Sequence, residues 1–365
     1  MKVGILTDGI DKPVLTGPAN YTFNLCKNLL NMSNDELCFI HHDKGSRHEL
    51  YEKGTEVVIP KYLLLAGSFL KNYGFDIVHF RRIRPFWGLL NFKRIVTSTD
   101  SVWAALRPRS LRDKWGSFYT KTTHWLFREL LDFVITTSNS AKRTLVKYAG
   151  IPEYRIRTIY NGVDFDTFRP INQEELESFK KKYGIDYPYI LHVSNYHPVK
   201  DPVILLKSFY ECKKKGFKHK MVVVGARWKR SRIMKMISQL GLQNDVRFFG
   251  FVTQHELCRF FNGASLFFLP SLKEAFPSVA LEAMACGCPI VSSNAYGIPE
   301  ATGEAALLAN NPRSSSEFSD LMIQLLLDNS LKTEVVKKSL TRARKFDWGI
   351  TARRTLEIYR QVVGT

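Results

Sequence analysis

The sequence lacks several features that would assign it to other protein classes. Its cysteines include no C-x-x-C pair, which argues against a zinc ribbon and against a disulfide framework. No apolar run reaches the roughly 18 residues needed to span a bilayer. No G-x-G-x-x-G follows the first predicted strand, which argues against a dinucleotide oxidoreductase. We therefore expect reduced core thiols at Cys26, Cys38, Cys212, Cys258, Cys286 and Cys288.

A metal-ligand cluster and a targeting segment are also missing from the sequence. His41, His42 and Asp43 stand together, but no second group of ligands follows them, so we predict a solvated loop there and no metal. Residues 1–6 read as the start of a strand rather than as a signal peptide. These features predict a cytoplasmic protein without a metal cofactor.

Acidic residues are few beside basic ones. The chain has 34 Asp and Glu against 53 Lys and Arg, a net charge of +19. Such an excess suits nucleic acid, an anionic membrane or an acidic ligand. Between residues 81 and 128 the cations are interleaved with Trp and Phe. That mixture fits a helix on an anionic bilayer, a surface for single-stranded nucleic acid, or a solvated face whose aromatics lie in the core.

Length and periodicity predict two α/β domains. The chain has 365 residues, 45% hydrophobic and 24% charged, which is more than one ordinary core holds. Short apolar runs alternate with helix candidates, which predicts largely parallel sheets with helices on both faces. The strand candidates are residues 3–7, 37–40, 56–59, 76–80, 94–97, 133–136, 159–164, 189–194, 221–225, 246–252, 266–269 and 289–291. The helix candidates are residues 19–30, 174–183, 276–285, 321–327 and 351–362.

The most informative stretch is residues 271–300, which opens just after an apolar strand. Glu274 lies in the loop beyond the carboxyl end of this strand, where open α/β sheets bind ligands. A helix then starts near Pro277 and ends before Gly287. Glu282 lies on it one turn after Ser278, on the same face.

This arrangement suggests a ligand with hydroxyls on both sides of an anion. Backbone N–H groups around Ser278 and Val279 favour a diphosphate. Glu274 and Glu282 can then each accept hydrogen bonds from hydroxyls on one side of it. A nucleotide-sugar has this shape.

The segment EAFPSVALEAMACGCPIV resembles the E-x7-E motif of the retaining glycosyltransferases of family 4, also called glycosyltransferase group 1. The resemblance implies the GT-B architecture, in which two Rossmann-like domains with parallel sheets face each other across a cleft. It also implies metal-independent transfer of a hexose from a nucleotide-sugar to a glycan or lipid-linked acceptor, with the anomeric configuration retained and no cofactor. The E-x-F-P form favours UDP-sugars and leaves GDP-mannose open.

The resemblance assigns roles to several residues. Lys200 and the helix start at Ser278 stabilise the departing diphosphate, Glu274 orients the sugar, and Glu282 holds the ribose. Glu274, Lys200 and Asp100 form the implied catalytic set. The remaining implied donor-binding residues are Gly17, Asn195, Phe251, Val252, Phe276, Pro277 and Val279.

Two positions depart from the family pattern. Thr99 precedes Asp100 where many members have histidine, and Asn195 stands where many have arginine, while Lys200 is kept. An alternative is therefore a catalytically degenerate homologue that only binds a nucleotide-sugar. The charge motivates a further alternative, a nucleic-acid-binding protein. His79 in the strand at residues 76–80 either faces the acceptor or is a hydrogen-bonded structural histidine.

The segment IRTIYNGVDFDTFRP resembles the family's domain junction. It sets the expected domains at residues 1–168 for the acceptor, 169–345 for the donor, and 346–365 for a helix that crosses back to the first domain. The D-x-D at Asp164 and Asp166 is explained by this context, so we predict no metal there. Because the family's first domain handles the acceptor, the basic and aromatic region 81–128 favours an anionic membrane surface over nucleic acid. Such contact would make the protein peripheral to the cytoplasmic membrane face.

Overall fold

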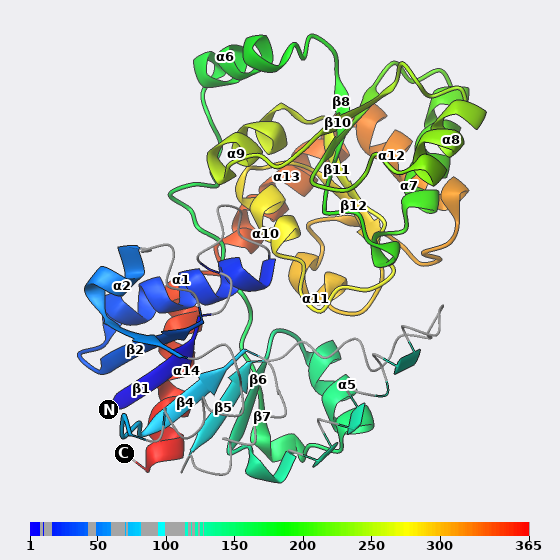
Figure 1. The fold of residues 1–365 in the computed structure, drawn as a ribbon. Coiled ribbons are helices and arrows are strands. Elements are labelled where there is room, and N and C mark those ends of the chain that lie inside the picture. The colour runs from blue at the N-terminus through cyan, green and yellow to red at the C-terminus, as the bar shows by residue number, and fades with distance from the viewer. Residues whose placement is uncertain are drawn as a thin grey trace. The chain divides into compact units, whose positions relative to one another are not determined.

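The computed structural model describes residues 1–7, 10, 17–42, 49–59, 70, 72–81, 94–98, 114–115, 118, 121–122, 125–126 and 128–364 (Figure 1). The chain divides into two compact units. The first is Met1–Gly162 together with Trp348–Thr365, and the second is Val163–Asp347. The sequence predicts the corresponding boundaries at 168/169 and 345/346.

A parallel sheet forms the centre of the first unit. Its described strands are ordered β3-β2-β1-β4-β5-β6-β7. They are short and almost continuously apolar, because a parallel sheet covered on both faces buries successive side chains alike. The strands are β1 (Lys2–Leu6), β2 (Glu36–His41), β3 (Thr55–Val58), β4 (Ile77–Phe80), β5 (Ile95–Ser98), β6 (Phe133–Thr136) and β7 (Ile156–Thr158).

Helices cover this sheet, and the last helix of the chain is one of them. Helix α14 packs against α1, and its Trp348 and Tyr359 join one buried cluster with Val3 and Leu25. A Cβ on Gly162 would lie 2.4 Å from the Trp348 backbone nitrogen, so only glycine allows this approach. The helices of the unit are α1 (Gly17–Met32), α2 (Glu49–Lys53), α5 (Asn139–Ala149) and α14 (Trp348–Val363), with short 3-10 turns at Arg128–Leu130 and Glu153–Arg155.

The second unit is also built on a parallel sheet, ordered β10-β9-β8-β11-β12-β13. Its strands are β8 (Tyr189–Val193), β9 (Lys220–Val224), β10 (Val246–Phe249), β11 (Leu266–Leu269), β12 (Ile290–Ser293) and β13 (Leu307–Ala309). Its helices are α6 (Gln173–Tyr183), α7 (Pro202–Lys214), α8 (Ser231–Gln239), α9 (Gln254–Gly263), α10 (Ser278–Ala285), α11 (Ile298–Thr302), α12 (Ser315–Leu327) and α13 (Asn329–Ala343), with a 3-10 turn at Pro198–Lys200.

Local sequence explains where α10 begins and ends. Pro277 is its N-cap in an extended conformation, and the helix starts at Ser278. Cys286 ends it, and Gly287 follows with φ +70°, a left-handed conformation that glycine adopts without strain. The helix is thus placed by the residues that the sequence analysis identified, with Pro277 just before the first turn rather than inside it.

One predicted strand is wrong. Residues 159–164 were expected to form a strand and a tight turn, but the last strand of the first sheet is Ile156–Thr158 and Val163 makes only an isolated bridge to Asp347. The chain leaves the sheet here, and Asp164 accepts hydrogen bonds from Asp166 N at 3.1 Å and Thr167 Oγ1 at 2.8 Å. The D-x-D is therefore part of a local turn.

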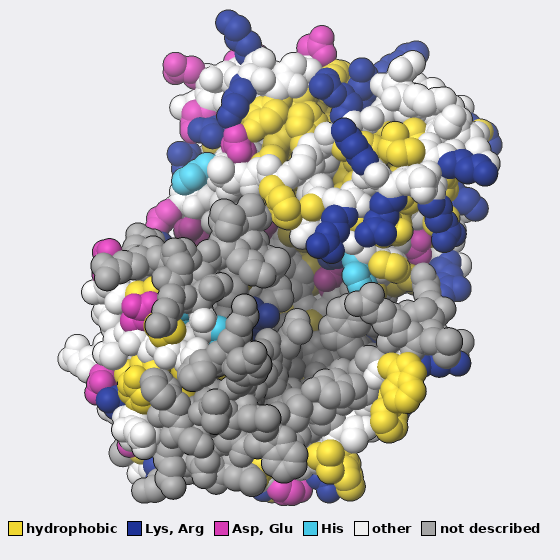
Figure 2. Space-filling view, viewed as in Figure 1, with side chains coloured by type: hydrophobic (Ala, Val, Ile, Leu, Met, Phe, Trp, Pro, Cys, Tyr) yellow, Lys and Arg dark blue, Asp and Glu magenta, His cyan; other side chains and the backbone are white. Residues whose placement is uncertain are grey.

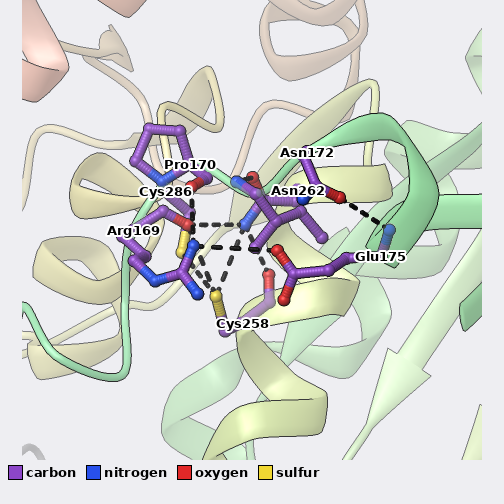
Figure 3. A network of polar contacts seen from close by, with 8 residues as sticks. Arg169, Pro170, Asn172, Glu175, Cys258, Asn262 and Cys286 are labelled. Atoms are coloured by element: carbon purple, nitrogen blue, oxygen red, sulfur yellow. Dashed lines mark hydrogen bonds and ion pairs between the residues drawn. The ribbon is translucent and has the colours of Figure 1, made fainter.

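Polar contacts fix the start of the second unit (Figure 3). Asn262 on α9 donates to the carbonyl of Arg169 at 3.0 Å and accepts from Ile171 N at 3.0 Å. Cys258, one turn earlier on α9, lies 3.7 Å from Cys286 between their sulfur atoms. All six cysteines are free and buried, as predicted.

None of the helices that the structure describes has the length and apolar character to cross a membrane. Figure 2 shows Lys and Arg side chains gathered over α7 and α8. The exposed cations of these helices and of the loop before α8 are Lys207, Lys214, Arg227, Lys229, Arg230, Arg232 and Lys235. Positive charge therefore also marks the second unit and is not confined to region 81–128.

Candidate functional site

The order of strands in the second sheet creates a switch point. Successive strands β8, β9 and β10 run to one side, and β11, β12 and β13 run to the other, so β8 and β11 are neighbours. In open parallel sheets, ligands bind beyond the carboxyl ends of the strands at such a point. The loops after β8 and β11 contain Lys200 and Glu274, so the topology brings these two predicted residues to one place.

Lys200 and Glu274 form an ion pair. Lys200 Nζ lies 2.5 Å from Glu274 Oε1, and their side chains are only 20% and 16% exposed. The two loops are also joined through the backbone, because Leu272 N donates to Val199 O at 2.8 Å. A cation and a carboxylate are thus adjacent, although 73 residues separate them in the chain.

Glu282 is a buried acid on α10. It is 8% exposed, and burial raises the pKa of its carboxyl group to about 7. Within the described chain, its Oε2 atom accepts no hydrogen bond. A buried polar atom without a partner is unfavourable, so this oxygen is suited to accept from a ligand hydroxyl.

The start of α10 lies between the two acids. Ser278 and Val279 form its first positions and are partly buried, at the positive end of the helix dipole. Phe276 is 6% exposed and packs edge to face on Phe346, with ring centroids 5.4 Å apart. The Phe276 side chain therefore anchors the loop in the core of the second unit.

Asn195 is exposed at the end of β8, and its side chain holds a neighbouring loop. Its Oδ1 accepts from Ala226 N at 2.9 Å, and Tyr196 N donates to Ala226 O at 2.9 Å. Trp228 Nε1 donates to Ser194 O at 2.6 Å and completes the connection. The loops after β8 and β9 are thus joined through the position where many family members have arginine.

Phe251 and Val252 follow β10 at the same edge of the sheet. Phe251 is 55% exposed and Val252 is partly buried. An exposed aromatic ring at the carboxyl edge of a sheet is suited to contact a planar base.

The predicted residues of the first unit have different outcomes. Gly17 is the exposed first residue of α1, and a Cβ there would meet no atom within 4 Å. Thr99 and Asp100 lie outside the described residues. His79 is buried, with Nδ1 2.5 Å from Tyr359 Oη and Nε2 2.6 Å from Ser98 Oγ, and burial lowers its pKa to about 4. The histidine thus matches the structural alternative.

Backbone strain gathers at this edge of the second sheet. Among the described residues, three that are not glycine have positive φ: Asp201 at 43°, Arg227 at 66° and Tyr296 at 52°. They lie in the loops that follow β8, β9 and β12. Strained backbone is concentrated at functional sites, because only a constrained local structure maintains it.

Two residues beside Glu274 were not singled out from the sequence. Lys273 is 6% exposed and its Nζ lies 4.4 Å from the centroid of the Tyr296 ring. In the sequence, nothing distinguishes Lys273 from a surface lysine. At Tyr296, the only signal of a turn is the glycine that follows it. Among the described residues, no group of three or more His, Cys, Asp or Glu is placed to hold a metal ion.

Comparisons with known proteins follow this division of the chain. The family model described as Glycosyltransferase Family 4 matches residues 15–167, and the model described as Glycosyl transferases group 1 matches residues 174–342. A D-inositol 3-phosphate glycosyltransferase of Corynebacterium jeikeium is 27% identical over 63% of this chain and 58% of its own length. The mannosyltransferase WbdA of Escherichia coli is 29% identical over 61% of this chain, but only 28% of WbdA is matched.

Solved structures share the fold over the full length. Sucrose-phosphate synthase of Thermosynechococcus elongatus has a TM-score of 0.80 at 18% identity, covering 100% of this chain and 99% of that chain. Anabaena HepE in complex with UDP-glucose has a TM-score of 0.79 at 19% identity, covering 99% of this chain and 100% of that chain. Two units on parallel sheets of this kind are the GT-B fold. The chain therefore belongs to the family 4, group 1 glycosyltransferases.

Proposed function

We propose that this protein transfers a hexose from a nucleotide-sugar to a glycan or lipid-linked acceptor, and that the second unit holds the donor. The observation that carries the proposal is the pairing of Lys200 with Glu274 at the switch point, with buried Glu282 on the adjacent helix. A cation can stabilise the charge of a diphosphate, and carboxylates can accept hydrogen bonds from hydroxyls on its two sides.

Each charged residue has a role in this proposal. Lys200 and the start of α10 at Ser278 stabilise the negative charge that develops on the leaving diphosphate. Glu274 exchanges its contact with Lys200 for hydroxyls of the sugar, and Glu282 accepts from the ribose. Phe251 and Val252 border the base, and the strained loops keep these groups in place before the donor arrives.

The finer features of the reaction belong to the same proposal. We propose retention of the anomeric configuration and no requirement for a metal, with Asp100 as a polar group of the first unit. For the donor we favour a UDP-sugar, since HepE was solved with UDP-glucose. GDP-mannose stays an alternative, and the mannosyltransferase relatives support it.

We also propose that the first unit meets an anionic membrane when it reaches a lipid-linked acceptor. The described residues of region 81–128 include Trp115, Phe118 and Trp125, which are 70%, 62% and 55% exposed. Exposed aromatics beside cations are typical of a surface that lies at the interface of a bilayer. Most of this region lies outside the described residues.

The test is release of nucleoside diphosphate from UDP-glucose, GDP-mannose and ADP-glucose in the presence of a chelator. We expect cleavage of one donor class, with a loss of about a hundredfold or more in Glu274→Gln and Lys200→Ala. Glu304→Gln, at an exposed glutamate of the same unit, is the matched control and should keep full activity. NMR of the transferred sugar then gives its anomeric configuration.

The main alternative is a degenerate homologue that binds the donor and does not turn it over. Thr99 and Asn195 motivate it, since they stand where many family members have histidine and arginine. This alternative would be established if wild type binds the donor but releases no nucleoside diphosphate, whichever acceptor is supplied.

A further inference from the structure

Tyr296 has a backbone conformation that its side chain disfavours. Its φ is 52°, a region in which a bulky residue is a genuine outlier. Its ring is 40% exposed, so core packing does not account for the strain. A residue that keeps such a conformation must be held by specific neighbours.

One such neighbour is Lys273, the cation that precedes Glu274. Lys273 Nζ lies 4.4 Å from the centroid of the Tyr296 ring, within the range of a cation–π contact. Lys273 is 6% exposed, and burial lowers the pKa of its amine to about 8. The electron-rich face of the ring offsets part of the cost of keeping this ammonium group away from water.

Two further hydrogen bonds join the segments that carry this pair. Ser293 Oγ donates to Ser271 O at 2.5 Å, and Gly297 N donates to Glu274 O at 2.9 Å. A Cβ on Gly297 would lie 1.7 Å from Ala275 O, so the loops approach as closely as a glycine permits. Tyr296 thus immediately precedes the residue that binds the backbone of Glu274.

We propose that Tyr296 is a positioning residue, which clamps Lys273 and thereby holds the Glu274 loop in the geometry that meets the donor sugar. The proposal rests on the proposed function of Glu274. Lys200 restrains this loop from the β8 side, and Tyr296 restrains it from the β12 side. A relaxed loop would let the Glu274 carboxylate drift from the sugar hydroxyls.

Three variants separate positioning from a merely structural role. Tyr296→Phe keeps the ring and should behave as wild type. Tyr296→Gly removes the ring, which costs the contact with Lys273, and also relieves the strained φ. These two effects on stability have opposite signs, so the melting temperature should stay close to that of wild type. Lys273→Met removes the cation, and the double variant Lys273→Met/Tyr296→Gly should be no worse than either single variant, because both changes break one contact.

The experiment on the full chain has two readouts. Hydrogen exchange of the peptide spanning residues 271–277 should be faster in Tyr296→Gly and unchanged in Tyr296→Phe. With UDP-glucose as the probe, the kcat of donor cleavage should fall about tenfold in Tyr296→Gly. The Kd for UDP should stay unchanged, because Glu274 serves the sugar rather than the nucleotide.

The outcomes decide between the proposals. Unchanged exchange of residues 271–277 in Tyr296→Gly overturns the clamp, and so does a parallel loss of UDP affinity and melting temperature. If wild type neither binds UDP nor cleaves UDP-glucose, the favoured donor class fails. The clamp is then decided by hydrogen exchange alone.

Discussion

Among single residues, Glu282 is a buried acid whose charge state changes near neutral pH. Its folded pKa of about 7 lies above the ordinary value of 4.5, so the folded protein binds more protons than the unfolded chain between these values. Stability from this group is therefore complete below about pH 4.5 and is lost as the pH rises through 7, by at most about 3 kcal/mol.

Glu282→Gln should remove this pH dependence. The difference in melting temperature between pH 5 and pH 8 should become smaller than in wild type, and the variant should be the more stable of the two at pH 8. Calorimetry adds a second check, because ribose hydroxyls that donate to Glu282 favour its ionised form. The nucleotide's own terminal phosphate also titrates near pH 6. Nucleotide binding at pH 6.5 should therefore release more protons in wild type than in Glu282→Gln, whereas equal release in both would contradict the assignment.

Breaking the ion pair between Lys200 and Glu274 should affect the binding of UDP and the cleavage of the sugar donor in different ways. In Glu274→Gln the ammonium group loses its carboxylate, so it becomes more available to a diphosphate. We expect the affinity for UDP to be unchanged or severalfold higher, while cleavage of the sugar donor falls about a hundredfold. A variant that loses both UDP binding and cleavage would show that Glu274 holds the loop rather than the sugar.

Among the structural elements, helix α14 depends on a close backbone contact between its Trp348 and Gly162. Gly162→Ala would bring a Cβ within 2.7 Å of both the Trp348 nitrogen and its Cα, so backbone must move. We expect a loss of about 1–3 kcal/mol in the free energy of unfolding, measured by denaturant titration. Gly250→Ala is the control, since nothing lies within 4 Å of its Cβ. Equal stability of both variants would contradict this contact.

The sequence predicts elements well where local signals agree. Strand β11 is continuously apolar, Pro277 marks the start of α10, and Gly287 marks its end, so this segment could be placed from its residues. Helix α9 was missed, although Thr253 and Glu256 form a capping box whose spacing is readable in sequence. The strand at residues 159–164 failed because the packing of Gly162 on Trp348 is a long-range contact.

The candidate site was predictable only in part, for a related reason. Glu274, Ser278 and Glu282 share one local motif, so their proximity follows from a single loop and helix. The ion pair with Lys200 depends on the neighbouring positions of β8 and β11, which no local pattern encodes. The clamp of Lys273 by Tyr296 depends on two loops more than 20 residues apart in the printed sequence.

For the whole molecule, the net charge of +19 predicts binding to anionic surfaces. We expect the protein to sediment with vesicles that contain phosphatidylglycerol and to be released as salt rises, because the attraction is screened. Neutral phosphatidylcholine vesicles are the control for the lipid.

Charge removal distinguishes the two basic surfaces. Replacing Arg107, Arg109 and Arg112 by glutamine tests region 81–128, and replacing Arg230, Arg232 and Lys235 tests the surface near α8. If region 81–128 is the membrane surface, only the first triple variant loses vesicle binding. Loss in the second alone would move the membrane surface to the second unit.

The most direct test of the donor site is calorimetric titration with UDP and GDP of wild type, Glu282→Gln and the control Glu304→Gln. We expect wild type and the control to bind one of these nucleotides with equal affinity. Glu282→Gln should bind it about tenfold or more weakly, because a buried hydrogen bond to the ribose is lost. Equal binding by all three proteins, or no binding of either nucleotide by well-folded wild type, would contradict a nucleotide-sugar site at the carboxyl edge of the second sheet.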